Sequence, residues 1–487
     1  MSNLKTLAKD TAIYGASSIL GRFLNYLLTP LYTNTLTADS GGYGVITNVY
    51  AWTALLLVLL TFGMETGFFR FANKENEDPK RVYSTTLLIV SAVAVTFAVV
   101  TLLLLKPIAG MLGYGEHPWY IGIMVIVVAM DAIQSIVFAY LRYLKRPIRF
   151  ATLKLLFILL NISLNLIYYV GMGGRDAGYT FFINLICTSV IMLCLIPYMR
   201  GFKYVLDRAL LKRMWRYSMP LLILGVAGIL NQTADKMLFP FIYPDKAEGL
   251  TQLGIYGAAS KIAMIMAMLT QAFRYAYEPF VFGKSRESDS REMYAKAMKY
   301  FIIFTLLAYL GVIFYMDILQ YIVGGDYRDG LRVVPIVMAA EIFMGVYFNL
   351  SFWYKLIDET RWGAYFSLIG CVVLVTINVL FIPHYGYMAC AWGGFAGYGV
   401  AMLLSYFVGQ RKYPIRYDLK GIGIYVLLAA MLYVAAEAVT IDSLVLRLVY
   451  RTVLLLLFVG YFAKRDLAIP ISKPRNSASP RKRPMQE

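Results

Sequence analysis

Ionisable side chains interrupt the long apolar segments of this chain, and they are the residues that could carry chemistry. Arg22 stands mid-way along the first apolar segment, with no acidic residue within one helical turn. An ionised side chain is costly inside a bilayer, so it usually faces a cavity, a partner or both. Arg binds phosphate bidentately, and Lys binds it as a point charge. Arg22, Lys236, Lys261 and Arg274 therefore predict a cationic central cavity that suits an anionic head group, especially a diphosphate.

Several of these cations also have a purely structural interpretation. Arg22 could act only as an ion-pair residue, and Lys236 could neutralise the adjacent Asp235. Lys261 could extend its amine along the apolar surface towards water. The position of Lys154 near the start of the fifth segment favours the same interpretation, in which its amine reaches the membrane interface.

Two glutamates occupy matching ends of the second and eighth segments. Glu65 lies near Arg70 in the sequence, and Glu278 lies four residues after Arg274. Residues four apart share a helix face, so Arg274 and Glu278 could form an ion pair. We expect either symmetric ion pairs that gate the cytoplasmic mouth or constant structural pairs.

Three other carboxylates lie within apolar segments. Asp131 and Glu341 are matched in the fourth and tenth segments, and with Asp235 they are candidates to bind a coupling Na⁺ or H⁺. In the last segments, a structural pairing is favoured for Arg447 and Arg451 with Glu437.

The chain contains an internal repeat. A shift of 210 residues places Gly15 on Gly225, Pro30 on Pro240 and Asp131 on Glu341. A shift of 213 residues places Tyr43-Gly44 on Tyr256-Gly257, Glu65 on Glu278 and Asn165 on Asn378. Two copies of one helical bundle, with polar groups at matching depths, are typical of transporters with a central site.

Composition indicates an integral membrane protein. The 487 residues are 60% hydrophobic and 15% charged, with a mean hydropathy of +0.63. Because a spanning helix needs roughly 20 apolar residues, we expect an all-α protein with fourteen spans. Their ranges are 10–33, 43–69, 82–105, 119–141, 148–171, 178–199, 217–241, 251–280, 294–316, 332–355, 362–382, 387–409, 421–440 and 444–463.

The repeat divides these spans into two lobes of six helices. Because six is even, a pseudo-two-fold axis along the membrane normal should relate the lobes. We expect a first lobe over residues 1–200, an amphipathic cytoplasmic linker over 201–216 and a second lobe over 217–410. Spans thirteen and fourteen fall within 411–466, outside the repeat, and a disordered basic cytoplasmic tail covers 467–487.

Basic residues sort by loop parity, which predicts the topology. Alternate loops are rich in Lys and Arg, whereas the other loops carry only Lys106, Arg175, Lys246, Arg328 and Arg332. By the positive-inside rule both termini lie in the cytoplasm. This asymmetry explains most of the net charge of +18, so a nucleic-acid partner is not needed to explain it.

Motifs for catalysis or metal binding are missing from the sequence. The four cysteines lie in apolar segments, and His117 and His384 have no carboxylate or Cys cluster nearby, which argues against a metal site. A P-loop is absent, so direct ATP drive is not expected. The sequence predicts no cofactor and no enzyme. A multi-span lipid-linked glycosyltransferase or ligase is the enzymatic alternative.

Several motifs resemble those of the polysaccharide-biosynthesis flippases. They are residues 7–15 (LAKDTAIYG) through Arg22, residues 28–32 (LTPLY), residues 39–45 (DSGGYGV) and the echo at 253–257 (LGIYG). The chain is similar to the Wzx-type O-antigen flippases of the MOP superfamily, which also holds the MurJ lipid II flippases and the MATE drug exporters. The resemblance covers essentially the whole chain, and Arg22 matches a basic first-helix residue important in such flippases.

The resemblance implies a function. It implies alternating-access translocation of an undecaprenyl-diphosphate-linked oligosaccharide across a bacterial inner membrane, for O-antigen or capsule synthesis. It implies partners in the polyprenyl-linked glycan, membrane lipids and the polysaccharide polymerase machinery. It also implies that spans thirteen and fourteen help form a groove for the lipid tail. The alternatives are a lipid II flippase like MurJ and a cation-coupled multidrug exporter like MATE.

Overall fold

The chain folds as a bundle of long helices. The computed structural model describes residues 26–74, 77–284, 290–357 and 359–467, and no strand occurs among them. Thirteen helical segments in these ranges are long and apolar enough to cross a membrane. They coincide with thirteen of the expected spans, which confirms the all-α membrane fold. The remaining span, over 10–33, falls mostly outside the described residues, as do Arg22 and nearly all of the basic tail.

The first half of the chain (residues 26–200) contains α2 to α9. Their bounds are α2 Leu28–Thr35, η1 Ala38–Ser40, α3 Gly42–Thr61, α4 Met64–Ala72, α5 Pro79–Leu103, α6 Leu105–Leu112, α7 Pro118–Tyr143, α8 Pro147–Leu166, η2 Ile167–Gly171, α9 Gly178–Leu195 and η3 Ile196–Tyr198.

The second half (residues 217–410) contains most of α10 and the helices up to α17, and a two-helix hairpin follows it. The bounds are α10 Arg208–Ile242, α11 Lys246–Lys284, α12 Ser290–Phe314, α13 Met316–Leu319, η4 Gln320–Ile322, η5 Gly325–Val333, α14 Val334–Leu350, α15 Phe352–Leu356, α16 Arg361–Tyr385, α17 Tyr387–Lys412, α18 Leu419–Ala438, α19 Leu444–Phe462 and η6 Ala463–Leu467.

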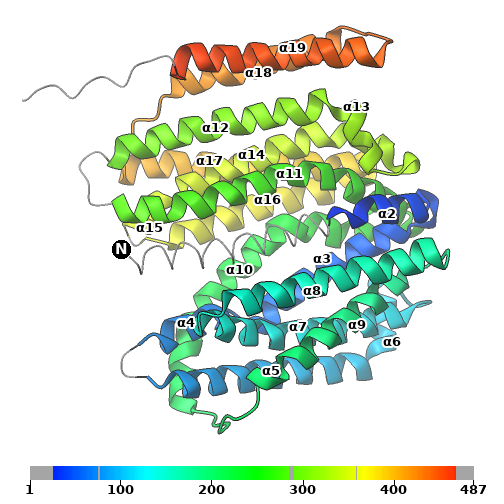
Figure 1. Cartoon of the computed structure of the whole chain (residues 1–487), viewed down its shortest axis with the longest axis vertical. Coiled ribbons are helices and arrows are strands. Elements are labelled where there is room, and N and C mark those ends of the chain that lie inside the picture. The colour runs from blue at the N-terminus through cyan, green and yellow to red at the C-terminus, as the bar shows by residue number, and fades with distance from the viewer. Residues whose placement is uncertain (1–25, 75–76, 285–289, 358, 468–487) are drawn as a thin grey trace, which may run out of the picture.

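The long helices run side by side, as Figure 1 shows. Helices α3 to α9 form one group, α11 to α17 form another, α10 crosses between them, and α18 with α19 lies along the outer side of the second group. One end of the bundle, at the left of Figure 1, holds the helix ends whose sequences are richest in Lys and Arg, and we call it the basic end. These termini include Arg70, Lys80, Arg142, Arg149, Lys412 and Lys420. We call the other end the distal end.

The expected second span is broken into two helices. Phe62 (φ 33°) and Gly63 (φ 72°) adopt left-handed backbone conformations between α3 and α4. Glycine tolerates this conformation, whereas phenylalanine is strained in it. The break packs against α10, where a Cβ added at Gly67 would lie 2.8 Å from Oγ of Ser218. The matching eighth span, within α11, is continuous.

The connection between the halves differs from the expected linker helix over 201–216. Residues 208–216 form the first turns of α10, the same helix as the seventh span, and residues 201–207 are not helical. Asp207 caps α10 by accepting from the backbone N–H groups of Ala209 and Leu210. The N–H of Leu210, together with Arg81 at 2.7 Å, lowers the pKa of the Asp207 carboxyl. Capping and packing thus extend the span through the linker.

These first turns of α10 belong with the first half. The side chains of Leu210 and Met214 are fully buried in the core formed by α4, α5 and α7. Arg213 also pairs with Glu77 at 2.6 Å. The chain therefore passes from one half to the other inside α10, and not at a separate linker.

The two halves meet closely at the distal end. A Cβ added at Gly44 of α3 would lie 1.8 Å from the carbonyl oxygen of Leu250 in α11. At Gly324 an added Cβ would lie 1.9 Å from the carbonyl oxygen of Thr33. Tyr327 donates from its hydroxyl to the carbonyl of Leu36 at 2.9 Å. Small residues therefore let the backbones touch and close this end of the bundle.

Ion pairs fix the α18–α19 hairpin to the second half at both ends. At the basic end, Lys299 of α12 lies 2.5 Å from Asp466 and 3.1 Å from Asp418. At the distal end, Arg447 and Arg451 of α19 contact the same oxygen of Asp317, at 2.8 and 2.9 Å. Arg451 also reaches Glu437, at 3.8 Å. The expected pairing with Glu437 is therefore secondary, because Asp317 lies closer to both guanidinium groups.

A substitution tests the close approach of the halves. Gly44→Ala places a methyl group against the Leu250 carbonyl, so α3 and α11 must separate. Overpacking of this kind costs about 1–3 kcal/mol, and we expect a lower melting temperature in detergent. Gly110→Ala in α6 is the matched control because its added Cβ meets nothing within 4 Å. Equal melting temperatures for the two variants would contradict this account of the distal end.

Candidate functional site

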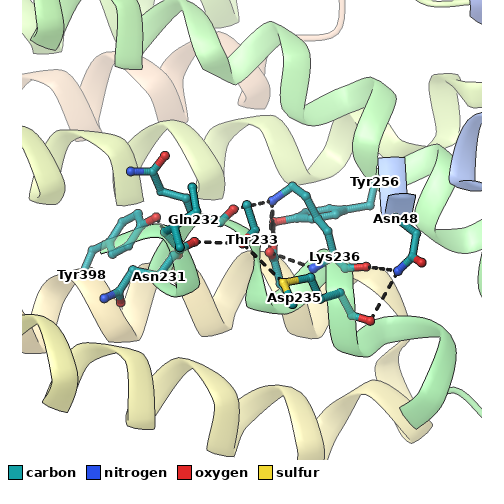
Figure 2. A network of polar contacts seen from close by, with 10 residues as sticks. Asn48, Asn231, Gln232, Thr233, Asp235, Lys236, Tyr256 and Tyr398 are labelled. Carbon is teal, nitrogen blue, oxygen red and sulfur yellow. Dashed lines mark hydrogen bonds and ion pairs between the residues drawn. The ribbon is translucent and has the colours of Figure 1, made fainter. Parts of the chain in front are cut away.

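A buried ion pair lies in α10 at the boundary between the halves, as Figure 2 shows. The Lys236 amine is 3.0 Å from each carboxylate oxygen of Asp235, and it also donates to the carbonyl of Gln232 at 3.1 Å. Tyr256 of α11 donates its hydroxyl to Asp235 at 2.8 Å. The side chain of Asp235 is 7% exposed, whereas that of Lys236 is 23% exposed. The carboxylate is therefore enclosed, and the amine keeps an accessible side.

Two further charged residues from neighbouring helices lie within electrostatic range of this pair. Lys261 of α11 and Glu341 of α14 both interact electrostatically with Lys236. We call Asp235, Lys236, Lys261 and Glu341 the second-half cluster. Two lysines oppose two carboxylates, so its formal charge is zero. Four of the nine candidate residues thus lie together, but without the excess of positive charge that the sequence suggested.

Polar contacts anchor α10 around the cluster. Asn231 donates to the carbonyl of Ser367 in α16 at 2.8 Å. Tyr398 of α17 donates to the carbonyl of Asn231 at 2.9 Å. From the other side, Asn48 of α3 donates to the carbonyl of Lys236 at 2.7 Å. Both halves therefore hold this stretch of α10 through specific hydrogen bonds (Figure 2).

A second group of charges lies within the first half, and we call it the first-half cluster. Arg142 of α7 forms an ion pair with Glu65 of α4. Lys154 of α8 interacts electrostatically with both Glu65 and Asp131, and its amine lies 4.2 Å above the ring of Phe138. Glu65, Asp131, Arg142 and Lys154 also sum to zero formal charge.

The prediction that Glu65 pairs with Arg70 is wrong. Arg70 instead stacks on Tyr217 of α10, with its guanidinium carbon 4.1 Å from the ring centroid. Arg142 comes from α7, 77 positions away in the sequence. Arg142 lies in the last turn of α7, among the basic residues that the topology explains, so nothing in the sequence pattern marks it as a partner of Glu65.

The remaining candidate residues lie apart from the clusters or outside the described part of the chain. Arg274 packs on Phe348 of α14, 4.4 Å from the ring centroid. It follows Lys261 by thirteen residues in the same helix, so it lies about 20 Å further along α11. Its role in binding the diphosphate therefore stays a prediction. The side chain of Glu278 is not described, and Arg22 precedes the described residues, so their roles remain predictions.

Sequence reasoning missed the contributions of Asn48 and Tyr256. Each is a hydrogen-bonding residue in an otherwise apolar segment, and this is the sequence feature that could have marked it as part of a polar site. Among the described residues, no group of three or more His, Cys, Asp or Glu side chains is arranged to hold a metal ion.

A double-mutant cycle tests the buried pair. Lys236→Met leaves Asp235 enclosed without its cation, and breaking a buried pair in this way costs about 3–5 kcal/mol. Tyr256 still donates to the carboxylate, so we expect the lower end of that range. Lys236→Met combined with Asp235→Asn should recover most of the loss in unfolding measurements in detergent micelles. Lys246→Met, at the exposed start of α11, is the control. A double variant no more stable than Lys236→Met would refute the pairing.

Solved structures share the fold of this chain. A structure described as the lipid II flippase MurJ in an inward closed conformation aligns with a TM-score of 0.73 at 14% identity, covering 93% of this chain and 98% of MurJ. An inward-facing MATE multidrug transporter of the MOP superfamily aligns with a TM-score of 0.65 at 15% identity, covering 80% of this chain and 94% of the transporter. The MATE multidrug transporter DinF-BH aligns with a TM-score of 0.61 at 14% identity, covering 84% of this chain and 96% of that transporter.

Sequence comparison identifies the family. No curated protein matches the chain. The family model described as polysaccharide biosynthesis protein matches residues 7–277, which is more than half of the chain. The solved structures and this match therefore agree on a multi-helix membrane fold and a family. The chain belongs to the polysaccharide biosynthesis protein family.

Proposed function

We propose that this protein is a flippase that moves an undecaprenyl-diphosphate-linked oligosaccharide from the cytoplasmic to the periplasmic leaflet by alternating access. The family match and the MurJ-like fold support a flippase. The observation that carries the substrate class is the partly exposed amine-bearing side chain of Lys236 at the boundary between the halves, held 3.0 Å from Asp235, with the second cation Lys261 within electrostatic range. The membrane is the bacterial inner membrane, and the glycan belongs to O-antigen or capsule synthesis.

The basic end faces the cytoplasm in this proposal. Positive residues flank spans on the cytoplasmic side, and the basic helix termini gather at one end of the bundle (Figure 1). Both termini of the chain then lie in the cytoplasm. The distal end, where Gly44 and Gly324 bring the backbones into contact, is the periplasmic closure. The closed distal end directs a substrate from the cytoplasm towards the second-half cluster.

When a diphosphate binds, its phosphate groups replace carboxylates as the partners of the lysines in this cluster. Each lysine attracts phosphate as a point charge, while Asp235 and Glu341 compensate the charge of Lys236 before the substrate arrives. The 23% exposure of the Lys236 side chain lets it turn towards a substrate, and Tyr256 continues to stabilise Asp235. Arg22 adds the excess positive charge that the described cluster lacks.

The two six-helix lobes then rock about the bound head group, and the polyprenyl tail stays in lipid beside α18 and α19. Membrane potential favours outward movement of an anion by about 2.3 kcal/mol per charge per 100 mV. This bias acts without ATP, provided that the charges of the protein do not move with the substrate. The polysaccharide polymerase machinery is the partner that receives the product.

Two other substrates fit the same fold. A lipid II flippase also carries a lipid diphosphate, and the MurJ alignment favours it. A cation-coupled exporter is favoured by the MATE alignments and by the carboxylates Asp131 and Glu341 inside spans. These alternatives predict different phenotypes.

A complementation experiment tests the proposed function. A deletion strain should lose surface polysaccharide and accumulate lipid-linked repeat units, and the wild-type gene should restore both. Arg22→Ala and the neutral double variant Lys236→Met with Asp235→Asn should fail to restore them, because they lack cations for the diphosphate. Asp131→Asn should restore them, as should the control Lys106→Ala, whose side chain is exposed on α6. Immunoblots of membranes check that each variant is present.

Other outcomes would overturn the proposal. Unchanged surface polysaccharide, with drug sensitivity that depends on Asp131, would identify an exporter. Loss of viability in culture, even without the first sugar transferase, would identify a lipid II flippase. A new glycosidic product made from a sugar donor would identify a glycosyltransferase or ligase.

A further inference from the structure

Pro240 leaves one carbonyl of α10 without a partner in its own helix. In an α-helix the N–H of residue 240 would donate to the carbonyl of residue 236, but proline has no N–H. Pro240 lies inside α10, two residues before its end. The carbonyl of Lys236 therefore needs a donor from elsewhere, because an unsatisfied carbonyl is costly inside a membrane.

Asn48 from the other half supplies that donor. Its amide donates to the Lys236 carbonyl at 2.7 Å and contacts the Met237 carbonyl at 3.3 Å. Tyr114 holds the amide in this orientation by donating its hydroxyl to Oδ1 of Asn48 at 2.8 Å. Asn48 is 1% exposed and Tyr114 is 6% exposed. The link is therefore buried, oriented and shielded from water.

The link joins the distal closure to the candidate binding residue. Asn48 lies one helical turn along α3 from Gly44, where α3 touches Leu250. Its acceptor is the backbone of Lys236, whose side chain belongs to the second-half cluster. When α3 and α10 separate at this end, the Lys236 carbonyl loses its donor and cannot regain one from Pro240.

We propose that Asn48 is a latch residue that holds the distal end closed through the carbonyl freed by Pro240. The latch keeps this end shut until water or a substrate group supplies another donor to that carbonyl. This role in timing the opening rests on the proposed function, whereas the latch itself acts on the closed state without substrate. Asn48 is thus a positioning residue and not part of the phosphate-binding set.

Distance measurements between spin labels test the latch directly. Labels are placed at Glu116 in the first half and Asp326 in the second, both exposed at the distal end. The background has its four native cysteines replaced, and the protein is in lipid nanodiscs without substrate. A lost hydrogen bond of ordinary strength should raise the ratio of open to closed distances about three- to tenfold in Asn48→Ala.

Pro240→Ala provides an independent variant of the same link. It restores the N–H at residue 240, which competes with Asn48 for the Lys236 carbonyl, and it leaves the Asn48 side chain intact. It should therefore reproduce the shift in distances, even if Asn48→Ala does not fold. Asn34→Ala is the matched control, because Asn34 lies at the same end and its amide donates only within its own helix, to Pro30 at 2.7 Å.

The results separate the latch from the transport function. A second label pair at Glu116 and Arg175, both in the first half, should keep its distance in every folded variant. Unchanged distances between Glu116 and Asp326 in both Asn48→Ala and Pro240→Ala would overturn the latch. A shift in these distances would support it even if complementation showed that the protein does not carry a lipid-linked glycan.

Discussion

A bilayer interior offers no water to a charge or to a free carbonyl, so every polar group there must find its partner within the protein. Along α10 the structure meets this constraint with short, specific contacts. Asp235 receives hydrogen bonds from Lys236 and Tyr256, and the carbonyl freed by Pro240 receives one from Asn48. Both charged clusters are neutral for the same reason. Any change of conformation must therefore exchange partners and cannot simply release them.

Many of these contacts involve α10, because this helix packs against both halves. Its first turns are buried against α4 and α5, whereas Asn231 and Asp235 bond to helices of the second half and to Tyr256. Pro220, Gly225 and Gly228 lie between these two anchored stretches. The covalent connection between the halves is thus a helix held at both ends, with a proline and two glycines, which disfavour helix, between the two held stretches.

The spans were predictable because runs of about twenty apolar residues have no other stable environment. The break at Phe62 and Gly63 was not, because it packs against Ser218 of a helix that is distant in the sequence. Glu65 illustrates the same limit: Arg70, five residues away, points to a different face of the helix, while Arg142 arrives from α7. Asn48 was visible as a polar residue in an apolar run, but its acceptor depends on how α3 and α10 cross.

The hairpin of α18 and α19 is held at the basic end by Lys299 and at the distal end by Asp317. These contacts at opposite ends prevent the hairpin from tilting or sliding against the second half. The hairpin must therefore travel with the second half as one rigid unit, and its outer apolar side, including Val445 and Val453, keeps a fixed relation to α12. Lipids that cover this surface would contact the same side chains wherever the second half moves.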